Sequence, residues 1–501
     1  MAEIHEATLT PSKLELLPEW LARQRWYTAK GRLPTLRLLG RWRLDDPAGE
    51  VGIETLIVLD EGAQHVTGHV SARERHRSDP GTHDRAKGAG TVYQVPLTYR
   101  GAPLKGADHA LVGTLEHSVL GRRWVYDACH DPVYAAEVLR LAQGLVSAAS
   151  STVSDTPEPE VEASPSATWP GPITLTRSRV LTGEQSNTSI IGTGTLPDGH
   201  EVSVVCKVFR AVDHGDNPDV TLQSALTAAG CTRVPATIGV VSGAWERPDG
   251  ARRSRGHLVL AQEFLTGAED AFRVTTRTAA AGTPFGDRAR ALGEATAEVH
   301  ELLARSMPTE PARPERIDEV IASMEERLVA ALAESPGLAR HESAIRRVFG
   351  RVRDVPWPAF QRVHGDYHLG QVLDVPGRGW VLIDFEGEPL RPLAERNRSD
   401  QCLRDIAGML RSFDYTGATV ELAQPGHSAA EWVADAQSAF LDGYAHRAGH
   451  DPRDDATLLT AFLLDKALYE VVYEARHRPT WLPIPTRAID ALVGADDKDP
   501  R

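Results

Sequence analysis

The chain has 501 residues, of which 41% are hydrophobic and 25% charged, and its formal net charge is −14. This composition is typical of a soluble globular protein, and the length predicts roughly two to four domains. The acidic balance disfavours nucleic acid as a partner, and no apolar run is long enough to cross a membrane. Four widely spaced cysteines and an N-terminus without an apolar leader favour a reduced, cytoplasmic protein with neither a zinc site nor disulfides.

The N-terminal third alternates between helical and strand-like patterns. Residues 14–23 have the helical spacing of apolar side chains, whereas 55–59 form an apolar run typical of a strand. A second strand pattern at 91–99 precedes a helical segment at 132–142. Residues 147–170 are polar, acidic and rich in proline, which predicts a mobile linker.

The rest of the chain changes from strands to helices near residue 265. Apolar, β-branched runs at 202–209 and 257–264 predict strands. Further along, apolar side chains recur with helical spacing, most clearly in residues 289–304, 315–333 and 429–448. The sequence therefore predicts a β-rich region followed by an α-rich region.

One motif in the α-rich region has the chemistry of phosphoryl transfer. Such a transfer needs a carboxylate that positions the acceptor hydroxyl and takes its proton, and oxygen ligands that hold Mg²⁺ against the phosphates. Asp366, in a His-Gly-Asp motif, suits the first role, and the amide oxygen of Gln371 suits the second. Asp384 would emerge at the end of an apolar strand, with Glu386 at the same parity as a further ligand. Together these residues favour a catalytic site over a simple turn and a strand cap.

Lys207 is the main candidate for binding nucleotide phosphates. It lies in an apolar strand, where an ammonium group costs solvation energy unless it meets an anion; the alternative is a side chain that reaches water. Glu263 and Leu265 follow a later strand and fit a hinge whose backbone pairs with adenine. Small and hydroxylated residues upstream predict a hairpin that covers the phosphates, with Gly183, Gln185, Ser186, Asn187 and Thr188 as the contacts.

In this order the motifs resemble those of the maltokinase family and its amino-sugar kinase relatives, within the aminoglycoside-phosphotransferase-like group. The loop of that group begins His-Gly-Asp and usually carries an asparagine where this chain has Gln371. The matching stretches span nearly the whole chain, at residues 17–32, 183–188, 364–371, 383–389, 403–415, 465–474 and 478–482. The resemblance implies ATP and Mg²⁺ as cofactors and a small sugar as the acceptor.

The resemblance also implies an α+β, bilobal fold like that of eukaryotic protein kinases, preceded by an α/β cap domain. The implied divisions are the cap (1–90), an intermediate subdomain that ends in the linker (91–170), a β-rich N-lobe (171–265) and an α-rich C-lobe (266–501). Nothing in the sequence indicates an oligomeric state.

The N-lobe departs from the pattern of such kinases at the partner of Lys207. A helix glutamate usually pairs with this lysine, but no glutamate occurs between Lys207 and Trp245. Asp219 is among the acids available there, but its reach makes it a poor substitute. We therefore expect the pairing to be absent, or to form only when nucleotide binds.

The acceptor is expected among polar side chains of the C-lobe. Besides Asp366, the candidates are His368, Asp400, Arg404, Asp465, Glu470, Glu474 and Trp481. Several unpaired carboxylates would favour an acceptor that carries an ammonium group, although a solvated helix face would present the same charges.

We therefore predict phosphorylation of glucosamine to glucosamine 6-phosphate, with maltose to maltose 1-phosphate as the alternative. Residues 399–402 depart from the maltokinase pattern, through either a reshaped acceptor pocket or neutral drift. An aminoglycoside-modifying role is disfavoured because the N-terminal match is a sugar-kinase feature. The missing glutamate leaves a pseudokinase-like binding or regulatory protein as the alternative from another class.

Overall fold

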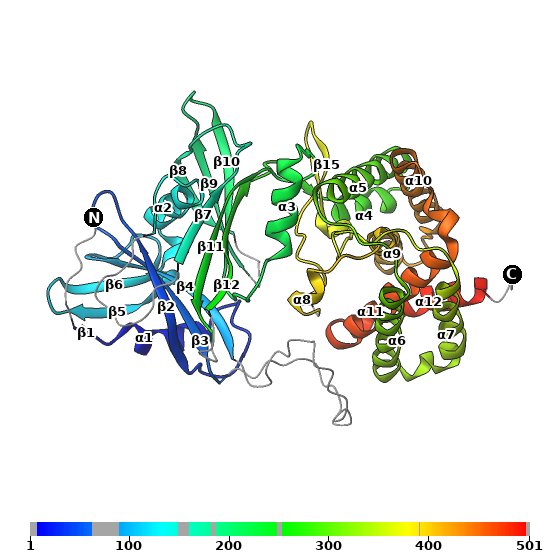
Figure 1. The fold of residues 1–501 in the computed structure, drawn as a ribbon, viewed down its shortest axis with the longest axis horizontal. Helices are drawn as coiled ribbons and strands as arrows, with labels where there is room; N and C mark the ends of the chain where they lie inside the picture. The colour runs from blue at the N-terminus through cyan, green and yellow to red at the C-terminus, as the bar shows by residue number, and fades with distance from the viewer. Residues whose placement is uncertain are drawn as a thin grey trace. The chain divides into compact units, whose positions relative to one another are not determined.

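The computed structural model describes residues 8–62, 90–148, 160–181, 187–247, 253–389 and 391–496. The chain divides into two compact units, which are considered separately (Figure 1). The first comprises Met1–Val220 and Ala236–Phe264, and the second comprises Thr221–Pro235 and Leu265–Arg501. Strands dominate the first unit and helices dominate the second, in agreement with the predicted order of β-rich and α-rich regions.

The first unit begins with a six-stranded antiparallel sheet in the order β1-β5-β6-β4-β3-β2. Its strands are β1 (Leu9–Thr10), β2 (Leu36–Leu44), β3 (Gly52–Asp60), β4 (Thr91–Arg100), β5 (Leu111–His117) and β6 (Gly121–Asp127). Helix α1 (Lys13–Ala22) starts at a capping box between Ser12 and Glu15, and it buries Leu17, Trp20 and Leu21 against this sheet.

This sheet differs from the predicted cap domain in two respects. The boundary expected near residue 90 does not appear, because β4 pairs with β3 and β6 pairs with β4, so that the sheet continues to Asp127. All its described strand pairs are antiparallel, so the cap is α+β and not α/β. The cap sheet thus includes residues 91–127, the first part of the predicted intermediate subdomain.

A second six-stranded sheet of the first unit has the order β7-β11-β12-β10-β9-β8. Its strands are β7 (Glu160–Pro165), β8 (Thr174–Val180), β9 (Asn187–Thr195), β10 (Glu201–Phe209), β11 (Thr237–Glu246) and β12 (Arg253–Glu263). Helix α2 (Pro132–Ala142) packs in the same hydrophobic core, at the position that the sequence predicted.

Strand β7 lies within the segment that the sequence predicted to be a linker. It pairs antiparallel with β11, and Val161 and Ala163 contact the core. The alternation of these two side chains with polar ones suits an edge strand, which the acidic and proline-rich composition concealed. The remainder of the predicted linker, residues 149–159, lies outside the described residues.

The cap sheet and the second sheet are joined within the first unit by buried polar contacts. The Gln94 side chain donates to the carbonyl oxygens of Phe209 (3.0 Å) and Leu258 (2.9 Å). The buried Arg210 guanidinium pairs with Asp127 at 2.7 Å. These contacts add to the hydrophobic core that residues of both sheets share.

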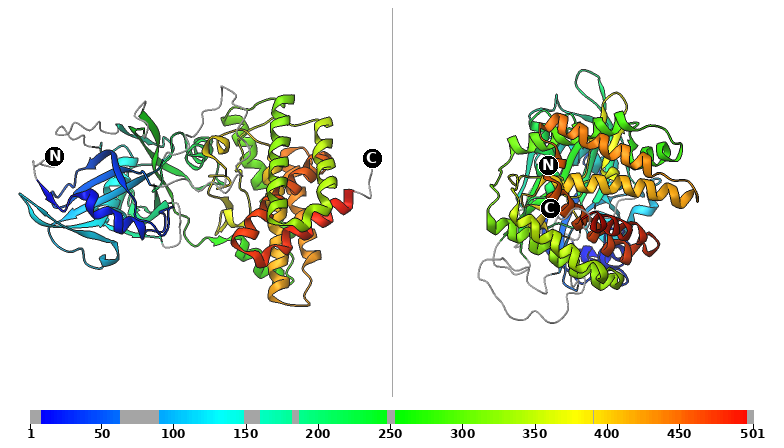
Figure 2. Two further views of the ribbon diagram at one scale, coloured as in Figure 1. Left: turned by 90° about the horizontal axis from the view of Figure 1, so that it is seen from below. Right: turned by 90° about the vertical axis from the view of Figure 1, so that its right-hand side faces the viewer.

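The second unit consists mainly of helices, with a small three-stranded sheet at one edge (Figure 2). The helices are α4 (Ala271–Ala280), α5 (Gly286–Ser306), α6 (Pro314–Glu334), α7 (Glu342–Arg351), α8 (Leu393–Arg396), α9 (Cys402–Ala423), α10 (Ala430–Ala448), α11 (Ala456–His477) and α12 (Pro483–Asp496). Helix α3 (Pro218–Ala228) begins in the first unit and ends in the second. The sheet contains β13 (Glu269–Asp270), β14 (Val372–Val375) and β15 (Gly379–Leu382). Helices predicted by periodicity match α5, α6 and α10.

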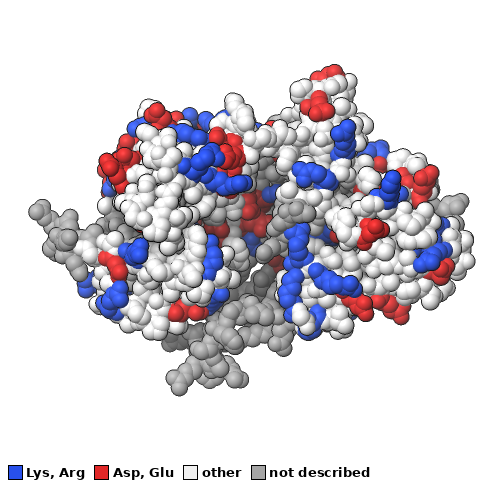
Figure 3. Space-filling view, turned by 180° about the vertical axis from the view of Figure 1, so that it is seen from behind, with Lys and Arg blue, Asp and Glu red and all other residues white. Residues whose placement is uncertain are grey.

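The surface carries both signs of charge. On the face shown in Figure 3, lysine and arginine are mixed with aspartate and glutamate over both units. None of the helices in the described ranges combines the length and the apolar character that a membrane crossing requires.

Candidate active site

The predicted catalytic loop is fixed to helix α9 through its backbone. The amide groups of His364 and Gly365 donate to the two carboxylate oxygens of Asp405, at 2.8 and 2.9 Å. Gly365 has a φ of 83°, which a side chain would disfavour. One helical turn beyond Asp405, a Cβ atom on Gly408 would lie 2.4 Å from the carbonyl oxygen of Tyr367. Asp405 and Gly408 thus set the distance between α9 and the loop.

A second layer of buried polar groups supports Asp405. The His300 ring lies 3.0 Å from Asp405 through Nε2 and 2.9 Å from the Tyr444 hydroxyl through Nδ1. All three side chains are buried. The sequence analysis did not identify Asp405 or His300, although Asp405 lies in a stretch that matches the family and His300 lies on a predicted helix.

Gln371 and Asp384 meet as predicted for a metal site. The Gln371 side-chain amide donates to Asp384 Oδ2 at 3.0 Å. Carboxylate oxygens of Asp384 and Glu386 lie within 4.8 Å of each other. Strand β15 ends at Leu382, however, and Asp384 has a φ of 64°, so the parity argument for Glu386 is wrong. The turn of the chain at Asp384, and not strand alternation, brings Glu386 close.

Asp366 is held by a lysine that the sequence analysis missed. Lys466, on α11, places its ammonium nitrogen 2.9 Å from Asp366 Oδ1 and 3.2 Å from Glu388 Oε1. Burial alone would raise the pKa of the Asp366 carboxyl, but the Lys466 charge, His368 and the hydrogen bond from Lys466 together hold this pKa below its usual value. Burial lowers the pKa of the neighbouring His368, which favours a neutral imidazole.

Three of the predicted acceptor residues form one ion-paired group. Arg404 contacts Asp400 at 2.6 Å and Asp465 at 2.8 Å. Arg327 then forms ion pairs with Asp465 (3.2 Å) and with Glu388 (3.5 Å), which connects the group to Lys466 and Asp366. Each of these carboxylates has a cationic partner. The expectation that unpaired carboxylates select an ammonium group is therefore wrong for Asp400 and Asp465.

The remaining acceptor candidates belong to a different group on α11 and beyond it. Glu470 pairs with the buried Arg411 at 2.7 Å. Glu474 accepts hydrogen bonds from Arg478 (2.7 Å) and from the Tyr415 hydroxyl (3.1 Å), and Trp481 stacks on the Tyr415 ring. Since their side chains are engaged with these partners, the structure does not bring Glu470, Glu474 and Trp481 together with Asp366.

Lys207 has an acidic partner within the first unit. It lies in β10, and its ammonium nitrogen is 2.8 Å from Asp219 Oδ2. Asp219 is fully buried in the first turn of α3. The prediction that Asp219 is a poor substitute for the missing glutamate is wrong, because α3 begins at Pro218 and brings this short side chain against the strand.

Two of the other predicted nucleotide contacts have structural partners. The Thr188 hydroxyl accepts a hydrogen bond from the buried Arg210 at 2.8 Å. Glu263 ends β12 and exchanges hydrogen bonds with the backbone of Ala236, and Leu265 opens the second unit. Gly183, Gln185 and Ser186 lie outside the described residues, which resume at Asn187.

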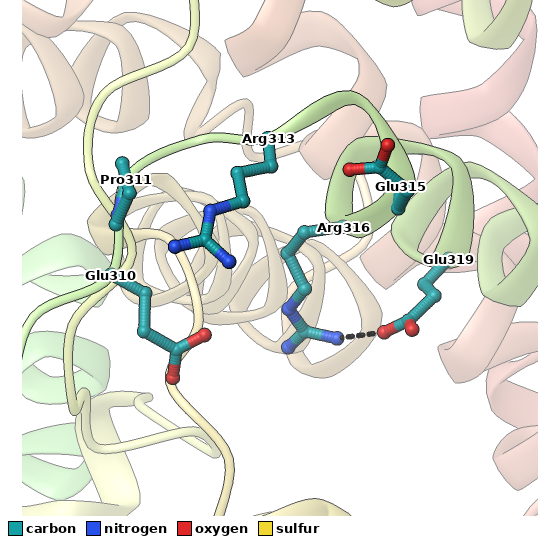
Figure 4. A pocket seen from close by; sticks show the side chains of 6 residues that line it. All are labelled: Glu310, Pro311, Arg313, Glu315, Arg316 and Glu319. Carbon is teal, nitrogen blue, oxygen red and sulfur yellow. Dashed lines mark hydrogen bonds and ion pairs between the residues drawn. The ribbon is translucent and has the colours of Figure 1, made fainter.

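Two hollows lie beside α6 in the second unit. The larger, of about 540 Å³, is shown in Figure 4 and is lined by Glu310, Pro311, Arg313, Glu315, Arg316 and Glu319. None of these residues was predicted for the site, and Arg316 is paired with Glu319 at 2.7 Å. The smaller, of about 310 Å³, shares these two residues and also contacts Asp400 and Arg404. It therefore adjoins the ion-paired group.

Comparison with known proteins identifies similar chains. The family described as the maltokinase N-terminal cap domain matches residues 20–131. A glucosamine kinase of Streptacidiphilus jiangxiensis is 30% identical over 365 residues, covering 66% of this chain and 76% of that protein. A glucosamine kinase of Mycolicibacterium smegmatis is 28% identical over 335 residues, covering 63% of this chain and 79% of that protein.

A solved structure resembles the whole chain. It is a glucosamine kinase in complex with glucosamine, ADP and inorganic phosphate, with 22% sequence identity and a TM-score of 0.62. The match covers 96% of this chain and 99% of that chain. The predicted bilobal kinase fold is thereby confirmed.

Proposed function

Since the chain belongs to the family that contains these glucosamine kinases and the maltokinase-type cap, we propose that it transfers the γ-phosphoryl group of ATP to glucosamine. The product is glucosamine 6-phosphate. One observation carries the proposal: Asp366 contacts Lys466 on a loop clamped to α9, in the same unit as the contact between Gln371 and Asp384. These are the parts that phosphoryl transfer requires of a protein.

Asp366 orients the acceptor and takes its proton. The 6-hydroxyl oxygen attacks the γ-phosphorus while the bond from that phosphorus to the bridging oxygen of ADP breaks, and the hydroxyl proton passes to Asp366. A carboxylate with a lowered pKa is a weak base, which suits a loose transition state in which the acceptor needs positioning more than deprotonation. The Asp405 clamp supports this positioning because it fixes the loop backbone.

Mg²⁺, when bound, neutralises charge that develops on the phosphates. Gln371 and Asp384 would hold it, with Glu386 as a further donor. All three offer oxygen ligands, which this hard cation prefers. The left-handed backbone at Asp384 supports a functional role, since such conformations are uncommon for residues other than glycine.

Replacing Asp219 by asparagine is expected to reduce kcat/KM for ATP roughly 10- to 100-fold, because Lys207 would lose the charge that orients it. Initial rates measured against ATP concentration at saturating sugar test this. Asp216→Asn, at an exposed aspartate three residues earlier, is the matched control and should retain the wild-type KM. An Asp219→Asn enzyme with unchanged kinetics for ATP would refute the assignment.

Maltose is the second candidate acceptor. Two observations favour it: the cap matches the maltokinase family, and the carboxylates Asp400 and Asp465 are already paired with arginine. The pseudokinase alternative loses its main support, because it rested on a missing partner for Lys207 and Asp219 supplies that partner.

The proposed function is tested by ADP release with Mg-ATP and separate sugars: glucosamine, N-acetylglucosamine, glucose and maltose. We expect kcat/KM for glucosamine to exceed the values for the other sugars by about tenfold or more. N-Acetylglucosamine serves as the control that removes the ammonium charge but keeps the 6-hydroxyl. Preference for maltose would establish the alternative acceptor, and ADP release independent of all four sugars would reject a sugar kinase.

A further inference from the structure

We propose that Lys466 is the positioning residue of the catalytic carboxylate: its ammonium group holds one oxygen of Asp366 and leaves the other to face the acceptor hydroxyl. This inference rests on the proposed function, since Asp366 has a catalytic role only if the protein is a kinase. Lys466 acts through Asp366 and needs no contact with the sugar.

The ammonium group of Lys466 is confined on three sides. Asp366 Oδ1 lies at 2.9 Å and Glu388 Oε1 at 3.2 Å from its nitrogen. The third side faces the Tyr469 ring, whose centroid is 4.6 Å away. The Lys466 side chain is only 12% exposed. An ammonium group has three donor hydrogens, so two carboxylates and one aromatic face account for all of them.

Glu388 is the second carboxylate that anchors the Lys466 ammonium group. The Glu388 side chain is 1% exposed, and Arg391 (2.9 Å) and Arg327 (3.5 Å) pair with its other oxygen. Both arginines therefore pair with the carboxylate oxygen that Lys466 does not contact. This arrangement fixes the ammonium group relative to the protein, and hence the orientation of the Asp366 carboxylate.

The charged groups around Asp366 and Lys466 determine whether the pKa of Asp366 rises or falls when Lys466 is replaced. The groups that face Asp366 are Lys466, His368 and Glu388. The groups that face Lys466 are Asp366, Glu388 and Tyr469, and Glu470 lies one helical turn away. Burial raises the pKa of Asp366 and Lys466 lowers it. Burial and the Glu388 charge both raise the pKa of Asp366, and after its removal the Lys466 charge no longer opposes them. The pKa of Asp366 must therefore rise.

The test is the pH dependence of kcat/KM for the sugar in Lys466→Met, compared with Lys466→Arg. In Lys466→Met the acidic limb should move to higher pH by about one unit or more, because Asp366 must be ionised to act. We also expect kcat to fall roughly 10- to 100-fold through loss of orientation. Because Lys466→Arg keeps the positive charge, the acidic limb of its pH profile should stay at the wild-type pH.

Arg476→Met is the matched control, because it removes a cation from the same helix, where Arg476 pairs with Glu334 at an exposed position (2.7 Å). Its profile should superimpose on that of the wild type. If Lys466→Met does not fold, Lys466→Gln keeps a donor of similar reach without the charge and should show the same shift. An active wild type with an unshifted limb in the uncharged variants would overturn this inference alone. A wild type without sugar-dependent turnover would overturn the proposed function first.

Discussion

Asp366→Asn is expected to lower kcat on the order of 10³-fold while KM for ATP stays within about threefold. The asparagine oxygen can still accept a hydrogen bond from Lys466, so the loop should keep its position. What the variant loses is the carboxylate that orients the hydroxyl and accepts its proton. Initial rates at saturating ATP and sugar, measured by ADP release, give the comparison.

Thermal unfolding controls for damage to the fold in this variant. Asp366 lies in a loop held mainly by Asp405, so the midpoint of unfolding should change little in Asp366→Asn. Asp405→Asn, in contrast, weakens the clamp itself and should lower both kcat and the unfolding midpoint. Near-normal turnover in Asp366→Asn would contradict the assignment of the catalytic loop.

Asp384→Asn is expected to reduce kcat/KM by a comparable factor, on the order of 10³-fold, and to raise the Mg²⁺ concentration needed for half-maximal rate. Asparagine tolerates the left-handed backbone at this position better than most residues, so the substitution removes the charge with little added strain. Rates measured across a Mg²⁺ titration at fixed ATP report the effect.

Asp374→Asn is a matched control for that titration. Asp374 lies on β14 of the small sheet, opposite Trp380, and its side chain pairs with Arg288 at 2.6 Å. It should show the wild-type dependence on Mg²⁺. Glu386→Gln should give an intermediate loss if Glu386 is a third ligand. An unchanged Mg²⁺ requirement in Asp384→Asn would rule out this aspartate as a metal ligand.

The site residues that can be predicted from the sequence are those that lie close together along the chain. Asp366, Gln371 and Asp384 lie within one stretch, and the structure brings Gln371 and Asp384 together. Lys466 could not be found in this way, because it lies 100 residues beyond Asp366. No spacing along the chain assigns it to a particular loop, since that contact depends on how α11 packs.

Asp219 shows a local pattern that was available and was not used. Asn217 caps α3, with its side-chain oxygen accepting from the Asp219 amide at 2.9 Å, and Pro218 takes the first helical position. An Asn-Pro-Asp sequence predicts such a helix start. Had the start of α3 been predicted, the buried first turn would have been the natural place for the partner of Lys207.

Composition is a poor guide to structure where a segment's conformation depends on contacts with other parts of the fold. Strand β7 was hidden in an acidic, proline-rich segment because an edge strand needs only one apolar face. The resemblance implied that the cap ends near residue 90, whereas β4 pairs directly with β3. The acceptor carboxylates appeared unpaired because their arginine partners, Arg327 and Arg404, come from α6 and α9.

The most direct test of the central claim is one reaction with Mg-ATP and equal concentrations of glucosamine and maltose, followed by ³¹P NMR of the sugar phosphates. Glucosamine 6-phosphate is the predicted product, and its phosphorus signal should be a triplet because it couples to the two protons on C6. A doublet from maltose 1-phosphate as the main signal, or the absence of any sugar phosphate, would contradict the account.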